Sequence, residues 1–435
     1  MAKKDFKIGI HTLGCKVSQY ESAAIKEKLE NCGYSVCDEI GGCDVVIVNT
    51  CTVTAEADRK CASFIRRAAK SGAKVIVCGC YSQIHGDKIE KNGVVYYSGT
   101  AGKMNIVDVV EAIYYNNSIP ESKVISPDAY GFEDMKITEF DRTRAYIKIE
   151  DGCDSHCSYC IIPKARGPVR SKPMADVIEE AEYLVSNGCK EIVLTGIEVD
   201  AWGKDTGEGN LTDLLEKVND IEGDFRIRLG SLDPFFITED FAMRASKLDK
   251  LAPHFHLSVQ SASSAVLRLM KRRYNAEKLN RAVELLKKHV DGVMFTCDII
   301  VGFPGETEAD FRETCDFAQR VGFINMHVFP YSERPGTVAA GLNGSVPVSE
   351  RKNRVRILSD IRDAVKHSVV SDKISKSNSH RVLVETKADN GYFAHGDDFV
   401  EYLILADSLE IGSFVDVTVT EVKNGCCFCV LSDKT

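Results

Sequence analysis

Three cysteines lie within one eight-residue segment, Cys153-Asp154-Ser155-His156-Cys157-Ser158-Tyr159-Cys160. Structural zinc sites usually take four protein ligands, whereas three thiolates on one short loop suit an iron–sulfur cluster. A 4Fe-4S cluster held by only three cysteines keeps one iron open for a small molecule. The spacing therefore predicts such a cluster, and a zinc knuckle or three unrelated buried cysteines are the simpler alternatives.

Composition narrows the class of protein. The chain has 435 residues, which favours two or three domains, and its 44% hydrophobic and 27% charged content is typical of a soluble globular protein. No apolar run is long enough to span a membrane, and no apolar stretch follows the basic N-terminus, so we expect a cytoplasmic protein. Seventeen cysteines in such a compartment indicate metal binding or redox chemistry besides packing. The net charge of −9 gives no global support for nucleic-acid binding, so such contacts need local patches.

The N-terminal third alternates short apolar runs with amphipathic stretches, which predicts a doubly wound parallel sheet. The expected strands are 8–11, 45–48, 75–78 and 94–97, and the expected helices are 19–30, 56–70 and 102–115. Cys15, Cys51 and Cys80 follow three of these strands. Because ligands of such sheets sit beyond the carboxyl ends of the strands, the three cysteines predict a second metal site. The simpler alternative is that they are ordinary strand-end residues.

A polar segment, 116–142, reads as a linker to a second unit. Six strands follow, with helices between them: 145–150, 191–194, 225–229, 254–259, 292–300 and 325–330. This pattern predicts an open (β/α)6 barrel with its chemistry at the carboxyl ends of the strands. A long helix over 349–374 then leads to short strands at 381–385, 400–405, 414–422 and 427–431, which predict a small antiparallel β-barrel. Cys426, Cys427 and Cys429 lie in that strand pattern, which favours packing over metal binding.

These segments together resemble the MiaB-like methylthiotransferases of the radical S-adenosylmethionine (SAM) superfamily over essentially the full length. The resemblance rests on TLGCKVSQYE at 12–21, NTCTVT at 49–54, ADRK at 57–60, DIIVGFPGET at 298–307 and FPYS at 329–332. It implies a methylthiotransferase N-terminal domain over 1–135, a radical-SAM core over 140–372 and a TRAM-like domain over 375–435. Within the family the chain is most similar to the MtaB type, which acts on N6-threonylcarbamoyladenosine at position 37 of tRNA.

The sequence departs from the family pattern in three places. Ser18 stands where this branch usually has Asn, and Gln260-Ser261-Ala262-Ser263 replaces Gln-Ser-Gly-Ser. The TRAM-like region is acidic, whereas the TRAM domains of tRNA-modifying relatives are expected to grip RNA. Because an acidic domain is poorly suited to bind RNA, a protein side chain is an alternative substrate. Isopentenyl-adenosine 37 of tRNA is another possible substrate, and a non-catalytic iron–sulfur electron carrier is a third possible function.

The resemblance implies two 4Fe-4S clusters with different roles. Cys153, Cys157 and Cys160 would hold the cluster that cleaves SAM, and the other three cysteines would hold the cluster that carries the sulfur to be transferred. The residues expected to contact SAM or substrate are Tyr159, Thr195, Gly196, Ser258, Gln260 and Asp298. We place Ser258, Gln260 and Asp298 at the ends of strands, where each could equally be structural.

The expected macromolecular partner is the tRNA anticodon loop, whose unstacked bases are accessible to side chains. Arg166, Arg170 and Arg272 follow the cluster loop or lie in a basic run, so we expect them to neutralise tRNA phosphates, although such runs are often only solvated helix faces. The reaction also requires an external electron donor and an external sulfur donor. We expect a monomer.

Overall fold

The structure is a computed structural model that describes residues 3–89, 93–140 and 143–432. Its N-terminal unit is a five-stranded parallel sheet with the order β2-β1-β3-β4-β5. The strands are β1 (Lys7–Thr12), β2 (Ser35–Cys37), β3 (Val45–Thr50), β4 (Lys74–Gly79) and β5 (Val94–Tyr97). The helices α1 (Lys16–Asn31), α2 (Ala55–Ala69), α3 (Cys80–Ile89) and α4 (Ile106–Tyr114) connect or follow them. Every residue of β3 is buried, as expected for a central strand covered on both faces.

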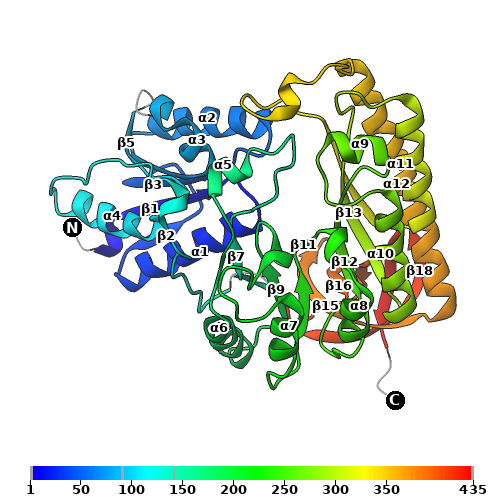
Figure 1. Ribbon diagram of the computed structural model, residues 1–435. Helices are drawn as coiled ribbons and strands as arrows, with labels where there is room; N and C mark the ends of the chain where they lie inside the picture. The colour runs from blue at the N-terminus through cyan, green and yellow to red at the C-terminus, as the bar shows by residue number, and fades with distance from the viewer. Residues whose placement is uncertain (1–2, 90–92, 141–142, 433–435) are drawn as a thin grey trace.

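The central unit is an open barrel of parallel strands, which lies beside the N-terminal sheet (Figure 1). Its two hydrogen-bonded groups have the orders β10-β9-β6 and β11-β12-β13-β14. They consist of β6 (Ala145–Lys148), β9 (Glu191–Thr195), β10 (Arg226–Leu229), β11 (Ser231–Leu232), β12 (His254–Gln260), β13 (Met294–Val301) and β14 (Asn325–Pro330). β10 and β11 are one strand path interrupted at Gly230, so six strand positions form the barrel and the prediction of six is confirmed.

Helices cover the outside of this barrel. They are α6 (Met174–Ser186), α7 (Leu211–Asn219), α8 (Glu239–Ala245), α9 (Ser264–Leu269), α10 (Ala276–His289) and α11 (Glu308–Val321). Along β12, Phe255, Leu257 and Val259 pack into the main core with these helices. The alternating residues of β12 are polar and point to the opposite, inner face, because side chains alternate along a strand.

The long helix α12 (Val348–Lys376) runs along the barrel to a closed five-stranded barrel at the C-terminus. This small barrel contains β15 (Ser379–Ala388), β16 (Gly391–Gly396), β17 (Glu401–Ile404), β18 (Phe414–Lys423) and β19 (Cys426–Leu431). It is antiparallel except for the parallel pair β17–β19. Cys427 and Cys429 are buried in its core, as the strand pattern indicates.

The C-terminal barrel packs against the end of the central barrel where the strands begin. Arg226 of β10 donates to the His395 carbonyl at 3.2 Å, and Arg228 donates to the Asp397 carbonyl at 3.0 Å. The acidic C-terminal unit is therefore remote from the cysteine loop, which follows the other end of β6. Among the described residues, no helix is long and apolar enough to cross a membrane.

Candidate functional site

The loop that carries Cys153, Cys157 and Cys160 is fixed by the backbone around it. The short strands β7 (Glu150–Asp151) and β8 (Arg170–Ser171) pair across its base. The Cys153 N–H donates to the Gly167 carbonyl at 3.0 Å, and the Ser158 N–H donates to the Met270 carbonyl at 2.9 Å. The loop is thus tied to α5 (Ile162–Arg166) on one side and to the segment after α9 on the other.

Each sulfur of this loop accepts a hydrogen bond. The backbone N–H of Ser155 donates to Cys153 Sγ at 3.3 Å, and that of Ile162 donates to Cys160 Sγ at 3.4 Å. The guanidinium Nη1 of Arg272 lies 3.1 Å from Cys157 Sγ. Such donors stabilise thiolates that bind a cluster.

Burial raises the pKa of the Cys153 and Cys160 thiols and so opposes their ionisation. It raises the pKa of Cys160 to about 12, with a smaller contribution from Cys157. Coordination to iron supplies the positive charge that such buried thiolates lack. Three free cysteines on one loop, each with a donor at its sulfur, fit a cluster with three protein ligands.

The second set of cysteines comes from three adjacent strands of the N-terminal sheet. Cys15 caps α1 after β1, Cys51 follows β3, and Cys80 begins α3 directly after β4. Burial raises the pKa of Cys51 to about 12, and the nearby thiols of Cys80 and Cys15 raise it further. Gly79 has a φ of +98°, and a Cβ at this position would lie 2.5 Å from the Thr50 carbonyl oxygen. Only glycine permits this tight approach of β4 to β3 before Cys80.

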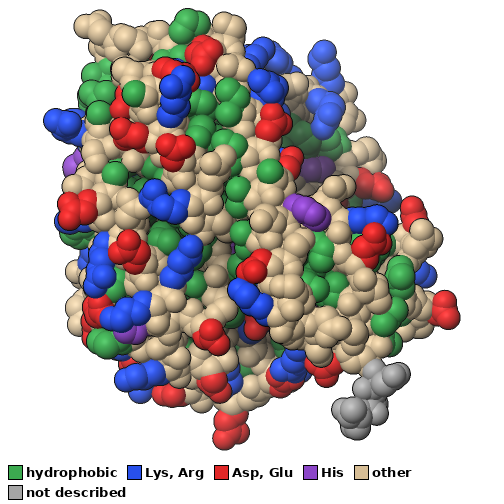
Figure 2. Space-filling view, turned by 90° about the vertical axis from the view of Figure 1, so that its right-hand side faces the viewer, with side chains coloured by type: hydrophobic (Ala, Val, Ile, Leu, Met, Phe, Trp, Pro, Cys, Tyr) green, Lys and Arg blue, Asp and Glu red, His purple; other side chains and the backbone are tan. Residues whose placement is uncertain are grey.

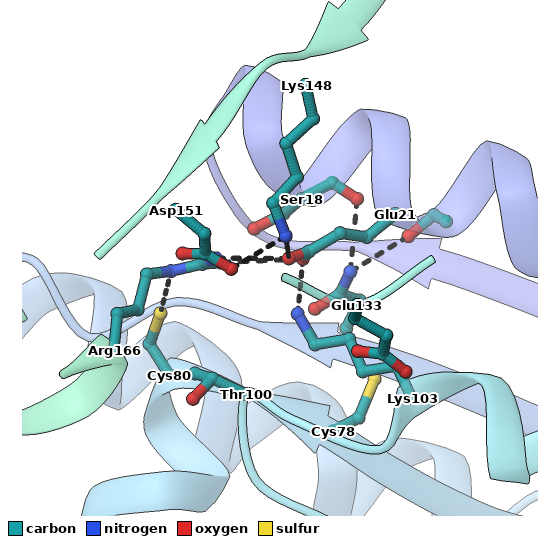
Figure 3. A network of polar contacts seen from close by, with 12 residues as sticks. Ser18, Glu21, Cys78, Cys80, Thr100, Lys103, Glu133, Lys148, Asp151 and Arg166 are labelled. Atoms are coloured by element: carbon teal, nitrogen blue, oxygen red, sulfur yellow. Dashed lines mark hydrogen bonds and ion pairs between the residues drawn. The ribbon is translucent and has the colours of Figure 1, made fainter. Parts of the chain in front are cut away.

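The two sets of cysteines face each other across the boundary between the sheet and the barrel. Helix α3, which begins with Cys80, contacts α5, which directly follows the cysteine loop. Between the two units lies Arg166, at the end of α5, with its Nε 3.2 Å from Cys80 Sγ (Figure 3). An arginine therefore donates to one cysteine in each set, Arg272 to Cys157 and Arg166 to Cys80.

Arg166 belongs to a buried network of charges that joins the two units (Figure 3). Its Nη1 lies 3.0 Å from Glu21 Oε1 of α1 and 2.8 Å from Asp151 Oδ1 of β7. Lys148 contacts the same two carboxylates at 3.0 and 2.6 Å, and Lys103 pairs with Glu21. Although burial opposes it, Arg166, Lys103 and Lys148 hold the pKa of Glu21 well below its usual range. The network links α1 to β6 and fixes the helix against the barrel.

This burial corrects the expectation that three arginines hold tRNA phosphates. Arg166 is 0% exposed and Arg170 is 8% exposed. Arg170 donates to the Pro127 carbonyl at 2.9 Å, and Arg272 pairs with Asp233 at 2.8 Å in addition to Cys157. The positive charges of all three are already directed at internal carboxylates, carbonyls and thiols. The expectation was wrong because their partners are distant in the sequence.

Three residues expected to contact SAM lie close to the cysteine loop. Tyr159 is packed edge-on against Phe303, with 6.2 Å between ring centroids. Thr195 ends β9 and pairs with Lys148 of β6. A Cβ at Gly196 would lie 2.6 Å from Glu150 Oε2, so this glycine admits the buried Glu150 carboxylate. Their contact with SAM stays a prediction.

Glu198 is a further residue of this region that the sequence analysis missed. Its carboxylate accepts from Cys153 Sγ at 3.0 Å and from the Ser155 hydroxyl at 3.1 Å. It also pairs with Arg273. The available signal in the sequence was the position of Glu198, three residues after Thr195, which ends β9.

The remaining predicted residues lie on the inner face of the barrel. Ser258 and Gln260 are on β12, and Gln260 ends that strand with a φ of +59°, which is strained for a non-glycine residue. Asp298 lies in the middle of β13 and not at its end, which corrects the expectation. Their contact with SAM or substrate stays a prediction.

Two histidines that the sequence analysis missed bind Asp298. His256 Nε2 lies 3.2 Å from Asp298 Oδ2, and His327 Nδ1 lies 3.1 Å from Oδ1. One ligand atom from each of these three residues lies within 4.8 Å of the others, so the trio could hold a metal ion. The signal for His256 was its alternation with Ser258 and Gln260 along one strand.

The comparisons with known proteins agree with this architecture. Residues 147–318 match the radical SAM superfamily, and residues 7–97 match the uncharacterized protein family UPF0004. The chain is 38% identical to the threonylcarbamoyladenosine tRNA methylthiotransferase MtaB of Thermotoga maritima, covering 96% of this chain and 95% of the relative. It is 35% identical to the protein of the same name from Bacillus subtilis, covering 95% and 93%.

The chain is also similar to a relative with a different printed name and to a solved structure. The tRNA-2-methylthio-N(6)-dimethylallyladenosine synthase of Fusobacterium nucleatum is 34% identical, covering 96% of this chain and 98% of the relative. Among solved structures, the radical SAM methyltransferase TsrM of Kitasatospora setae, with cobalamin and a [4Fe-4S] cluster bound, has a TM-score of 0.56 at 16% identity. It covers 76% of this chain and 75% of that one. This structural likeness supports the fold alone.

Proposed function

The chain belongs to the methylthiotransferase family of radical SAM enzymes, and we propose that it inserts a methylthio group at C2 of N6-threonylcarbamoyladenosine at position 37 of tRNA. The observation that carries the proposal is the placement of two sets of three cysteines on facing edges of the sheet and the barrel. A radical SAM enzyme needs only one such set to cleave SAM. The second set supports the delivery of sulfur to the same substrate.

The two proposed iron–sulfur clusters would have different roles. When bound, a 4Fe-4S cluster on Cys153, Cys157 and Cys160 would supply the electron for SAM cleavage, and a second cluster on Cys15, Cys51 and Cys80 would carry the sulfur. Arg272 and Arg166 each donate to one ligand sulfur and offset its negative charge. The buried ion network fixes the N-terminal sheet relative to the barrel. We propose that the units 1–135, 140–372 and 375–435 act as sulfur carrier, radical-forming core and accessory domain.

The chain must also bind the backbone of the anticodon loop and extract one base from its stack. Because Arg166, Arg170 and Arg272 are internal, we propose that exposed cations replace them. Arg268 and Lys271, at and just after the end of α9, are exposed close to the segment that anchors the cysteine loop. On the face turned toward the viewer in Figure 2, the basic and acidic side chains of the described residues are interspersed.

Mass spectrometry of tRNA nucleosides from a deletion strain tests the proposal. We expect 2-methylthio-N6-threonylcarbamoyladenosine to disappear and its precursor without sulfur to accumulate, with restoration by a plasmid-borne copy. Loss of the isopentenyl-type product instead would transfer the chain to the other tRNA branch. Loss of a methylthiolated protein with unchanged tRNA would show that the substrate is a protein side chain. We further propose that the enzyme acts as a cytoplasmic monomer with external electron and sulfur donors.

A further inference from the structure

Two exposed side chains, those of His327 and Phe329, lie next to each other on the inner face of the barrel. Both belong to β14, the last strand of its sheet. Met326 and Val328 pack into the main core on the other face of this strand, so the alternation of side chains directs His327 and Phe329 inward. Phe329 is 42% exposed, and the side chain of His327 is 56% exposed. The pair therefore offers an aromatic ring and an imidazole to a ligand.

The imidazole of His327 is held by hydrogen bonds that cross three strands. Its Nδ1 lies 3.1 Å from Oδ1 of Asp298 on β13. The other oxygen of Asp298 lies 3.2 Å from Nε2 of His256 on β12, and Nδ1 of His256 lies 2.8 Å from Thr296 Oγ1. Because a carboxylate only accepts, His327 donates its Nδ1–H, and Nε2 of the neutral ring is an acceptor. Within the described residues this Nε2 makes no hydrogen bond, so it can accept one from a ligand.

The ring of Phe329 lies between this imidazole and the cysteine loop. It meets the ring of His327 edge-on, with 6.4 Å between centroids. Its register partner on β13 is Ile300, which packs with Tyr159 of the cysteine loop against one small hydrophobic cluster. A phenylalanine ring that stays exposed gives up the free energy of burial, but it can stack on a flat ligand. This ring therefore suits a planar ligand bound close to the loop.

The strand that carries the pair continues to the other set of cysteines. Beyond β14, the Ser332 hydroxyl accepts from the Ala55 N–H at 3.0 Å. Nη2 of Arg334 donates to Thr52 Oγ1 at 2.7 Å, and Thr52 directly follows Cys51. The exposed pair thus lies on a strand that contacts the surroundings of both proposed clusters, which is where a base must sit to receive sulfur.

We propose that Phe329 and His327 form a base platform, on which the Phe329 ring stacks on the adenine of nucleotide 37 and His327 Nε2 accepts an N–H of the base or of its N6 substituent. This inference rests on the proposed function and names the residues that hold the extracted base. A base that leaves the loop loses its stacked neighbours, and an aromatic ring replaces them. Asp298 and His256 are positioning residues, because they act through the ring of His327.

The test measures binding of the full-length protein to synthetic anticodon stem-loops by fluorescence anisotropy. One RNA carries N6-threonylcarbamoyladenosine at position 37, and the other has an abasic nucleotide there. Phe329→Ala should weaken binding of the first RNA about 10-fold or more, because base–aromatic stacking is lost, and should leave binding of the abasic RNA unchanged. Phe329→Trp keeps an aromatic ring and should bind both RNAs like the native protein. Phe393→Ala removes a similarly exposed ring (44%) from the C-terminal barrel and is the matched control, which should keep the native ratio of the two affinities.

The role of His327 is measured with the same two RNAs. His327→Leu should weaken binding of the base-bearing RNA roughly 3- to 10-fold, as expected for one lost hydrogen bond, without affecting the abasic RNA. His327→Gln, whose amide oxygen can accept, should recover most of this loss. An equal effect of His327→Leu on both RNAs would remove His327 from the platform.

Two results would overturn the platform as a whole. One is an equal loss of affinity for both RNAs in Phe329→Ala, and the other is native affinity of this variant for the base-bearing RNA. Either result leaves the proposed function standing when the deletion strain lacks the methylthio nucleoside. If the native protein binds neither RNA and the nucleosides of the deletion strain are unchanged, the proposed function falls and the platform falls with it.

Discussion

The guanidinium Nε of Arg166 lies 3.2 Å from the Sγ of Cys80, although the two residues belong to different units of the protein. The same guanidinium pairs with Glu21 and Asp151. One side chain therefore links a proposed cluster ligand to the ion network that holds α1 against the barrel. A change at this position should affect both the cluster and the stability of the junction.

We expect Arg166→Gln to destabilise the protein by about 3 kcal/mol or more, because removal of one partner from a buried ion network leaves uncompensated charge. The loss of the donor to Cys80 should also change the EPR signal of the reduced N-terminal cluster. Urea unfolding and EPR of reconstituted protein measure the two effects. Arg59→Gln, at an exposed arginine of α2, is the control. An unfolding midpoint equal to that of the native protein would contradict the structural role.

The two cysteine sets should hold iron independently. Anaerobically reconstituted protein should contain about eight irons if both sets bind 4Fe-4S clusters. Replacement of Cys153, Cys157 and Cys160 by alanine should leave about half of that iron, because the other three cysteines lie on a separate sheet. Colorimetric iron analysis gives the number. Complete loss of iron in the triple variant would argue against an independent N-terminal cluster.

The roles of the two sets should be separable. Cys51→Ala should still cleave SAM to 5′-deoxyadenosine but form no methylthio product. Cys51 follows β3, and its hydrogen-bond partner Cys61 lies on α2 of the same unit, with the Cys51 N–H 3.4 Å from Cys61 Sγ. Chromatographic assay of both products tests this, with Cys61→Ala as a control for simple disturbance of the site. Methylthio product from Cys51→Ala would show that the sulfur-delivery role is wrong.

The sequence predicted the parts of the site that depend on local spacing. The cysteine loop, the strand-end cysteines and the order of sheet, barrel and small barrel follow from motifs and hydrophobic runs within short segments. The strand β16 was missed, because the six residues Gly391–Gly396 begin and end with glycine and resemble a turn. The predicted strands 8–11 and 45–48 correspond closely to β1 and β3, because central parallel strands are continuous apolar runs.

The roles of the charged residues could not be predicted in the same way. Arg166 looks like a solvent-exposed cation in the sequence, but Glu21, its partner, lies 145 residues earlier. Asp298 looks like the end of a strand, but β13 continues three residues beyond it to Val301. Whether a charge faces water or a buried partner is decided by tertiary packing, which a single segment does not encode.

Added salt should weaken the binding of tRNA, because phosphate contacts release counterions. Arg268→Gln and Lys271→Gln should each lower the slope of log K against log salt by about one. Filter binding at several salt concentrations gives the slopes. Glu277→Gln, on the exposed start of α10, is a charge-changing control that should leave the slope unchanged. If both variants show the same slope as the native protein, the RNA-binding surface does not include Arg268 and Lys271.

Mild acid should weaken the docking of the C-terminal barrel. His395 is stacked on Phe399 with 4.9 Å between ring centroids, at the contact with the central barrel. Burial lowers the pKa of His395 to about 4, with Arg144 lowering it further, although Glu385 Oε2 lies 2.9 Å from the Nδ1 of His395 and Glu401 opposes the shift. The unfolded chain, with a histidine pKa near 6.5, therefore binds more protons than the folded protein between about pH 6.5 and 4. Stability from this group is present above about pH 6.5 and declines as the pH falls toward 4.

The measurement is the urea midpoint of the native protein at about pH 7 and about pH 5.5, compared with His395→Gln. The native midpoint should fall on acidification, and the variant should lose part of that fall because it has no imidazole to protonate. The His254 ring stacks on Phe399 as well, with 4.8 Å between centroids, and burial holds its pKa well below the usual range. Its protonation acts in the same direction, so the variant keeps a residual pH dependence. His367→Gln, on α12, serves as the control for loss of a histidine elsewhere. Equal pH dependence in His395→Gln and the native protein would remove His395 as the source of the effect.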